Sequence, residues 1–301
     1  MDDSHKLAVI KQMFTQMRTA GTFDLSRDRA RYDSAADAFK SYVGSAVADV
    51  VLEGVQCEVH TPLELDVSGC IVYFHGGGYV LGSPRSHRHL AAEICRLTRC
   101  LVVVPDYSLS PEHPFPAALA DGRSVYRAVR ERWRDLPVCM AGDSAGGALA
   151  VSTAIQVRDN GDDRIRAIAC LSPWMDLTCS NARYQDGAAH DQSLDAHRLR
   201  TFADKYLGRH SPKDPLASPQ YAALGNLPPI LVQVGRDEIL HEDAVCFTNQ
   251  VRQACGSVEL EVWDQVVHVW HWYWPVLDSA RTAIARVSAF LLSHLTTSPR
   301  P

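Results

Sequence analysis

Six apolar runs, most of them separated by stretches with a helical pattern, constrain the fold of this chain more than any other feature. The runs are CIVYFHG (70–76), CLVVVPDY (100–107), PVCMAGD (137–143), RAIACLSPW (166–174), PILVQVG (229–235) and VELEVW (258–263). Continuous Val, Ile and Leu without polar alternation are typical of strands buried on both faces of a parallel sheet. Strand followed by helix, repeated, predicts a doubly wound α/β domain. With an antiparallel pair expected around VLEGVQCEVHT (51–61), we predict a mostly parallel eight-stranded sheet flanked by helices.

Two regions do not follow this alternation. Residues 1–45 have a helical pattern and no strand, and residues 177–217 interrupt the series with polar loop and helix. We interpret them as an N-terminal cap segment and a cap insertion that pack together over the carboxyl end of the sheet. The α/β core is then expected in two parts, 46–176 and 218–301. The alternative is a plain N-terminal helix and an ordinary insertion.

Composition and charge exclude several classes of function. The 301 residues are 46% hydrophobic and 22% charged, with a net charge of -5, which is typical of a globular domain. Basic residues are scattered, so no nucleic-acid partner and no polybasic membrane patch is indicated. No stretch reaches the roughly 18 apolar residues of a membrane helix. The first residues do not resemble a secretory signal, and we expect no stable membrane insertion.

The nine cysteines form no CxxC pair. We interpret them as buried, reduced thiols of a cytoplasmic protein. His268 and His271 have a spacing that a metal site could use. No carboxylate or cysteine cluster lies beside them in the sequence, so we expect no metal.

The segment CMAGDSAGGALA (139–150) places one serine between glycines, where neither helix nor strand is favoured. Ser144 follows an apolar run and precedes a helical pattern, and glycines at 142 and 146 remove side chains that would clash in a tight turn. Gly-x-Ser-x-Gly between strand and helix is the pattern of the nucleophile elbow of α/β-hydrolases. The alternative is that small residues merely allow close packing of helix on strand. The strand-turn-helix context favours the elbow, with Ser144 as nucleophile.

A serine nucleophile needs a base that a third group orients, and in this fold an acid and then a histidine follow it along the chain. Asp237 lies two residues past an apolar run, where functional groups of α/β sheets gather. We choose it as the acid over Glu238, its nearest rival, and over Asp243. His268 follows the last run by five residues and is the predicted base. His271 is expected in the next helical turn, as a packing or surface residue.

The glycine triplet of HGGGYVLGS (75–83) follows another apolar run. Preorganised N–H donors aimed at a developing oxyanion are often the largest catalytic contribution in acyl transfer. We predict the amides of Gly76 and Gly77 as donors, joined by Ala145, the residue after the nucleophile. A glycine triplet taken alone is usually only a flexible loop. An elbow serine in the same chain makes the oxyanion interpretation more specific.

Five segments together resemble the bacterial hormone-sensitive-lipase-like family of esterases, in its GDSAGG subgroup. They are HGGGYVLGS (75–83), DYSLSPEHPFPAAL (106–119), GDSAGG (142–147), DEILHED (237–243) and VVHVWH (266–271). The resemblance covers the chain from about residue 70 to 275 and implies an α/β-hydrolase core with a helical cap. Residue by residue, it assigns the nucleophile to Ser144, the acid to Asp237, the base to His268 and the oxyanion hole to Gly76, Gly77 and Ala145.

The chain departs from the family pattern at a few positions. Ser108 and Ser110 stand where members often have Arg and Ala, in a loop whose Glu112 is commonly a hydrogen-bonding residue near the site. Where many members have Asp-Pro-Leu, this chain has Asp-Glu-Ile at 237–239. The acid is left in place by that change.

The resemblance implies a serine carboxylesterase that needs no metal or organic cofactor. We expect short- to medium-chain acyl esters as small-molecule substrates, with lactones, acetylated sugars or amides as the alternative. A second hypothesis is a binding protein, like the plant gibberellin receptors, which lose the catalytic histidine that this chain retains. The substrate pocket is expected to be walled by aromatic and apolar cap residues, namely Met13, Phe14, Phe202 and Tyr206, together with Tyr79. The strand at 258–263 should lie at the sheet edge, which favours a homodimer.

Overall fold

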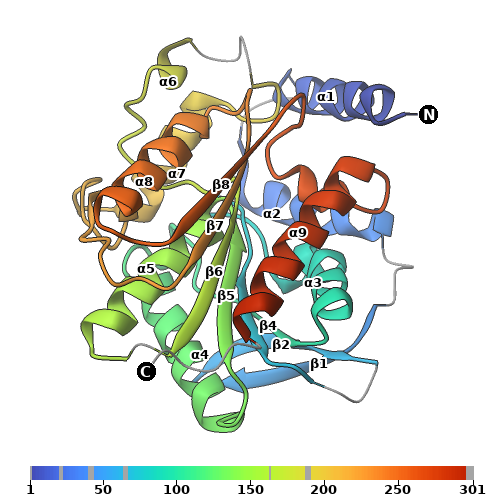
Figure 1. The fold of residues 1–301 in the computed structure, drawn as a ribbon. Coiled ribbons are helices and arrows are strands. Elements are labelled where there is room, and N and C mark those ends of the chain that lie inside the picture. The colour runs from blue at the N-terminus through green and yellow to red at the C-terminus, as the bar shows by residue number, and fades with distance from the viewer. Residues whose placement is uncertain are drawn as a thin grey trace.

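The computed structural model describes residues 2–19, 23–39, 44–63, 67–162, 164–186 and 191–295. Its eight-stranded sheet has the order β1-β2-β4-β3-β5-β6-β7-β8 (Figure 1). The strands are β1 (Ser45–Leu52), β2 (Val55–Pro62), β3 (Cys70–Phe74), β4 (Leu101–Pro105), β5 (Val138–Asp143), β6 (Ile165–Leu171), β7 (Ile230–Gly235) and β8 (Val258–Trp263). β1 and β2 pair antiparallel, β2 joins β4 antiparallel, and every later pairing is parallel. The prediction of a mostly parallel eight-stranded sheet is therefore confirmed.

Helices cover both faces of the sheet (Figure 1). On one face lie α4 (Ala117–Arg132), α5 (Ala145–Asp159) and α8 (His241–Gln253), and on the other α3 (Pro84–Thr98) and α9 (Asp278–Leu295). The central strands β3 and β5 are buried at every position, because alternate side chains enter the two cores. Phe74 and Met140 belong to the first core, and Tyr73 and Ala141 to the second. A sheet covered in this way is the reason for the apolar runs in the sequence.

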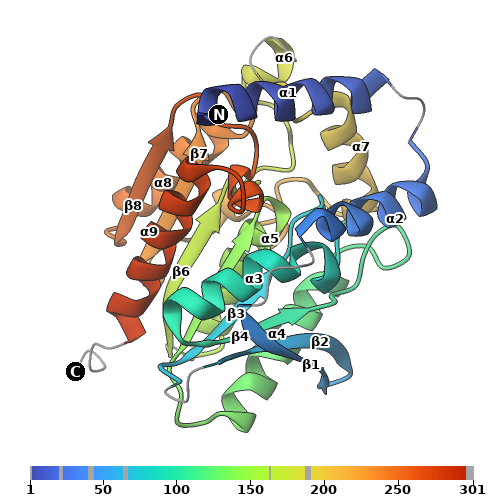
Figure 2. The same ribbon diagram turned by 90° about the vertical axis from the view of Figure 1, so that its right-hand side faces the viewer.

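The remaining helices gather at one end of the molecule (Figure 2). They are α1 (Asp3–Thr19), α2 (Leu25–Ala35), α6 (Arg183–Asp186) and α7 (Ala196–Leu207). Short 3-10 turns occur at η1 (Ala36–Phe39), η3 (Pro219–Tyr221) and η4 (Trp270–Tyr273). None of the described helices combines the length and apolarity that crossing a bilayer requires.

The N-terminal segment and the insertion contact each other at this end. The rings of Phe23 and Phe202 meet edge to face with centroids 5.4 Å apart, and the Arg198 guanidinium lies over both rings. Arg198 also pairs with Asp28 at 3.7 Å. Aromatic contact and the cation together attach α7 to the chain around α2. The division of the chain into core and cap at residues 45, 176 and 217 stays a prediction.

Candidate active site

Ser144 lies on a sharp turn between β5 and α5. Its backbone adopts φ 53° and ψ -122°, a conformation that a non-glycine residue rarely takes. A Cβ on Gly142 would come within 2.4 Å of the Gly146 carbonyl oxygen, and one on Gly146 within 2.0 Å of the Phe74 carbonyl oxygen. Only glycine fits at both positions, so the local sequence itself forces the turn that presents the serine. The residue is 7% exposed.

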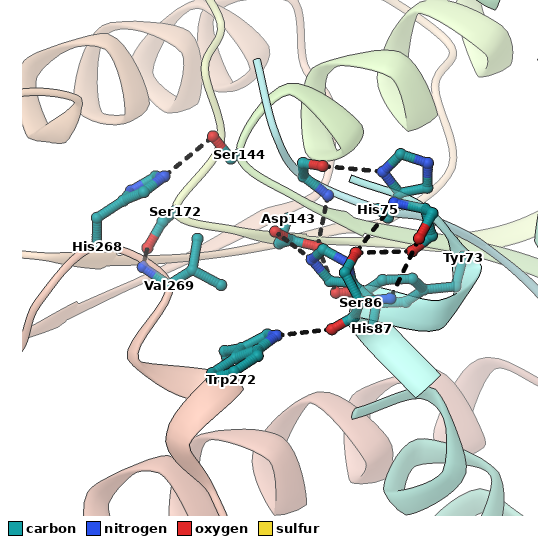
Figure 3. Close-up of polar contacts among 12 residues, drawn as sticks. Tyr73, His75, Ser86, His87, Asp143, Ser144, Ser172, His268, Val269 and Trp272 are labelled. Carbon is teal, nitrogen blue, oxygen red and sulfur yellow. Dashed lines mark hydrogen bonds and ion pairs between the residues drawn. The ribbon is translucent and has the colours of Figure 1, made fainter. Parts of the chain in front are cut away.

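His268 lies in the loop after β8 and faces this serine (Figure 3). Its Nε2 is 3.0 Å from the Ser144 Oγ. The next residue, Val269, has φ 49°, which is strained for a β-branched side chain. His271, by contrast, is fully buried and its Nε2 bonds to the Gln233 Oε1 at 2.8 Å. It is a packing residue, one of the two roles expected for it.

The carboxylate that meets His268 belongs to Glu238, and our choice of Asp237 as its partner is wrong. The Glu238 Oε2 accepts a hydrogen bond from the His268 Nδ1 at 2.7 Å. No hydrogen bond among the described residues joins Asp237 to this histidine. The Glu238 N–H donates to the Gly235 carbonyl at 3.2 Å, and the Gly235 N–H donates back to the Glu238 Oε1 at 2.6 Å. This tight turn directs Glu238 inward, where it is 1% exposed, and leaves Asp237 half-buried at the rim.

Ser172, at the end of β6, is a site residue that the sequence analysis did not find. Its hydroxyl donates to the Glu238 Oε1 at 2.7 Å and accepts from the Val269 N–H at 3.2 Å. It is fully buried and, like Ser144 and Val269, has a positive φ, here 47°. Three strained non-glycine residues in one cluster are typical of a functional site. No local sequence pattern marks Ser172, because its role depends on two loops that are distant in the chain.

Glu238 and His268 influence each other's protonation. Burial lowers the pKa of His268, but the hydrogen bond and the charge of Glu238 outweigh it and hold the pKa above the ordinary imidazole value. Burial raises the pKa of Glu238, against the hydrogen bonds from His268 and Ser172. With its Nδ1–H donated to the carboxylate, His268 keeps Nε2 free to accept the Ser144 proton.

The glycine loop after β3 is attached to the elbow through Asp143. The Gly76 N–H donates to the Asp143 Oδ1 at 3.0 Å, and the Tyr73 hydroxyl donates to the same oxygen at 2.7 Å. The His87 Nε2 lies 3.3 Å from the other oxygen of this carboxylate (Figure 3). Our expectation that the Gly76 amide faces an oxyanion is therefore wrong, because that N–H is already bound. The described residues offer no acceptor to the amides of Gly77 and Gly78, whose φ values are 123° and 64°.

The amide of Ala145 is the first N–H of α5. Such an N–H has no acceptor within its own helix. It follows Ser144 directly and opens the helix at the elbow, so it stays available to a group bound at the serine.

The expected pocket residues take four different positions. Tyr79 and Tyr206 stack with centroids 3.7 Å apart and an interplanar angle of 4°. The Phe202 ring lies over Gly78, where an added Cβ would come within 2.4 Å of it. Phe14 instead packs edge to face on Tyr273 with centroids 6.4 Å apart. Met13, also expected in the pocket, is 47% exposed.

Two further carboxylates near the acid have other partners. Asp243 accepts from the Asn181 amide at 2.7 Å and from the Tyr184 hydroxyl at 3.2 Å, and its burial raises its pKa to about 8. Asp191 accepts from the Ile239 N–H at 3.0 Å. Within the part of the chain that the structure describes, no three His, Cys, Asp or Glu side chains group as a metal site would need.

The geometry agrees with what the chain is similar to. A family model described as alpha/beta hydrolase fold matches residues 71–272. The chain belongs to the α/β-hydrolase family. Within this family its structural neighbours include esterases of the bacterial hormone-sensitive lipase family, and the protein is a hydrolase of ester bonds.

Three of these relatives show how far the similarity extends. An acetyl-hydrolase from Streptomyces hygroscopicus is 41% identical over 87% of this chain and 88% of its own length. An esterase from Acinetobacter venetianus is 29% identical over 82% of each chain. The crystal structure of an esterase from the bacterial hormone-sensitive lipase family superposes with a TM-score of 0.93 at 35% identity, covering 98% of this chain and all of that one.

Proposed function

We propose that this α/β-hydrolase is a serine carboxylesterase that works through Ser144, His268 and Glu238. The observation that carries the proposal is the unbroken series of hydrogen bonds from the Ser144 Oγ through His268 to the Glu238 carboxylate, with distances of 3.0 and 2.7 Å. A hydroxyl, an imidazole and a carboxylate in this order are the arrangement that activates a serine.

The chemistry follows from the roles of the atoms. The His268 Nε2 takes the Ser144 proton as the Oγ attacks the ester carbonyl, and Glu238 stabilises the imidazolium that forms. The imidazolium then protonates the leaving alcohol, which departs and leaves an acyl group on Ser144. Water, deprotonated by the same nitrogen, releases the acid and restores the serine.

The oxyanion of the tetrahedral intermediate requires N–H donors. We assign this role to Gly77 and Ala145, as the sequence suggested, and add Gly78 in place of Gly76. The support is that the Gly76 amide is bound to Asp143, whereas the other three have no acceptor among the described residues. Asp143 then holds the base of the glycine loop while the next amides turn toward the substrate.

For the substrate we propose short- to medium-chain acyl esters, with acetyl esters foremost. The relative named acetyl-hydrolase supports a small acyl group. The aromatic packing of Tyr79 on Tyr206 and of Phe202 on Gly78 supports it as well, because these rings fill space beside the glycine loop. A panel of p-nitrophenyl esters from acetate to laurate should show kcat/KM highest for the shortest chains. Lactones, acetylated sugars and amides in the same panel test the alternative substrates.

We further propose a homodimer that forms through β8. This strand pairs with β7 on one side only and is the last strand of the sheet. An unpaired strand edge invites association with a second copy. Size-exclusion chromatography at two concentrations should give a dimer, and a monomer at both would exclude it.

A cytoplasmic location is the last element of the proposal. All nine cysteines are free thiols, and seven of them are buried. Such thiols suit a reducing compartment. Fractionation of the producing cells should recover the protein with cytoplasmic markers.

The decisive test is the serine itself. Ser144→Ala should lower kcat on p-nitrophenyl acetate by about 10⁶-fold, with an unchanged circular dichroism spectrum. A fluorophosphonate probe should label the wild-type enzyme once per chain and leave this variant unlabelled. Retained turnover in Ser144→Ala would contradict the mechanism, and an unlabelled wild-type protein would favour a binding role instead.

A further inference from the structure

A short stretch of the insertion reaches the two loops that carry the acid and the base. Asp191 and Ser193 precede α7 and lie far in sequence from Glu238 and His268. The Ile239 N–H donates to the Asp191 Oδ2 at 3.0 Å. The His268 N–H donates to the Ser193 Oγ at 3.0 Å. Each contact is made to a backbone amide at or next to a residue of the proposed triad.

Asp191 and Ser193 also bind each other. The Ser193 hydroxyl donates to the Asp191 Oδ1 at 2.6 Å, and the same oxygen accepts from the Ser193 and Leu194 amides at 2.8 and 3.0 Å. A hydroxyl has a single proton. Because the Ser193 proton goes to the carboxylate, its oxygen must accept from His268. The donor and the acceptor of each hydrogen bond in this series are therefore determined.

The carboxylate is in a position to hold this arrangement firmly. Asp191 is 4% exposed, and hydrogen bonds to a buried, ionised acceptor are stronger than those between neutral groups. Four donors to it come from two segments of the chain, the insertion and the loop after β7. Ser193 adds the third segment, the loop after β8.

The contacts hold the backbone and leave the reacting atoms free. Fixing the amide of Ile239 places the residue before it, Glu238, and fixing the amide of His268 places its ring. The ring nitrogens remain available to Ser144 and Glu238. We propose that Asp191 and Ser193 are positioning residues of the esterase, so that the insertion aligns the acid and the base of the triad as well as covering the site.

This inference rests on the proposed function, since positioning is defined by the triad. Misplacement of a catalytic group by about 1 Å can cost on the order of 100-fold in rate. Ser193→Ala, which removes the acceptor for the His268 amide, should lower kcat on p-nitrophenyl acetate roughly ten- to hundredfold, with KM changed less than about twofold. Ser193→Thr keeps the hydroxyl and should restore most of that loss.

Asp191→Asn adds a readout that a purely structural role would not change. Glu238 and Ser144 bond to the His268 ring, and the charges of Glu238, Asp191 and Asp143, together with the buried His271, act on it. The negative charge of Asp191 contributes to raising the pKa of His268, and the base works only when neutral. Loss of that charge should move the acid limb of the pH–kcat/KM profile to lower pH and also reduce kcat.

Asp195→Asn is the matched control. Asp195 lies in the same segment and caps α7 by accepting from the Arg198 amide at 2.8 Å, and among the described residues it makes no hydrogen bond to the loops after β7 and β8. Asparagine is an equally good cap, so kcat and the pH profile should match the wild type.

The outcomes separate the two proposals. A wild-type enzyme that a fluorophosphonate does not label removes the proposed function, and the positioning role with it. A labelled wild type, with Ser193→Ala and Asp191→Asn both folded and equal to it in kcat and pH profile, removes the positioning role alone. If Asp191→Asn does not fold, the Ser193→Ala and Ser193→Thr pair decides: equal kcat in both variants overturns the inference.

Discussion

The elbow at 142–147 and the loop at 235–240 both follow a parallel strand, yet they are specified in different ways. In the elbow, a Cβ on Gly142 or Gly146 would overlap backbone atoms. The sequence therefore permits one backbone geometry, and that geometry presents the side chain of Ser144. In the second loop, two adjacent carboxylates are both compatible with the local chain. Glu238 is selected because Gly235, Ser172 and His268 converge on it. A turn that is forced sterically can be derived from its own residues, whereas a side chain selected by its partners cannot.

Within this comparison, the largest effect should come from replacing the Glu238 carboxylate by an amide. Glu238→Gln removes the charge that orients and stabilises His268, and should lower kcat by about 10³- to 10⁴-fold. Asp237→Asn is the matched control and should stay within about twofold of the wild type. Steady-state kinetics on p-nitrophenyl acetate measures both. If Asp237→Asn instead loses most of its kcat and Glu238→Gln keeps it, the assignment of the acid to Glu238 is wrong.

The elbow can be tested through its glycine. Gly146→Ala would put a Cβ 2.0 Å from the Phe74 carbonyl oxygen, and such overpacking costs about 1–3 kcal/mol of unfolding free energy or more. The esterase activity of this variant should fall as well, because Ser144 and the first turn of α5 must shift. Chemical denaturation measures the loss.

Gly225→Ala is the control for this experiment. A Cβ at Gly225 would find its nearest neighbour, the Ala254 carbonyl oxygen, at 3.9 Å. Its unfolding free energy should therefore equal or slightly exceed that of the wild type. Equal stability of the two variants would show that the elbow is less constrained than we infer.

Ser172 tests how much residues distant in the chain contribute to the orientation of Glu238. Ser172→Ala removes the donor to the Glu238 Oε1 and the acceptor of the Val269 amide. We expect kcat to fall about tenfold, which corresponds to about 1.4 kcal/mol of lost transition-state stabilisation. Ser172→Thr retains the hydroxyl and should recover part of the activity. An unchanged kcat in Ser172→Ala would mean that the loop after β7 orients Glu238 without outside help.

The smallest expected effect is a shift in pH dependence. Glu238 holds the pKa of His268 above the ordinary imidazole value, so the acid limb of the wild-type kcat/KM profile should lie at higher pH than the titration of a free imidazole. The limb rises with pH because the base must lose its proton. In Glu238→Gln the imidazolium loses its stabilising charge, and the limb should move to lower pH. In Asp237→Asn the acid limb should lie at the same pH as in the wild type.

Much of the molecule could be predicted from the sequence because local physics determines it. Buried parallel strands require continuous apolar runs, such as the one at 70–76, and the elbow requires glycines around Ser144. His268 could also be predicted, because it lies in the loop after the last strand and the remaining histidine nearby, His271, falls in the next turn.

The tertiary structure decided which atoms meet. It placed Glu238 rather than Asp237 on the base, and it bound the Gly76 amide to Asp143. It also brought in Ser172, Asp191 and Ser193, whose contacts join residues 48 to 75 positions apart in the chain. A sequence pattern shows which residues of one segment face a core. A hydrogen bond between distant residues depends on the positions and directions of two segments. That is the physical reason why the sequence by itself determined the fold and the elbow around Ser144, whereas the folded chain decided the partners of His268.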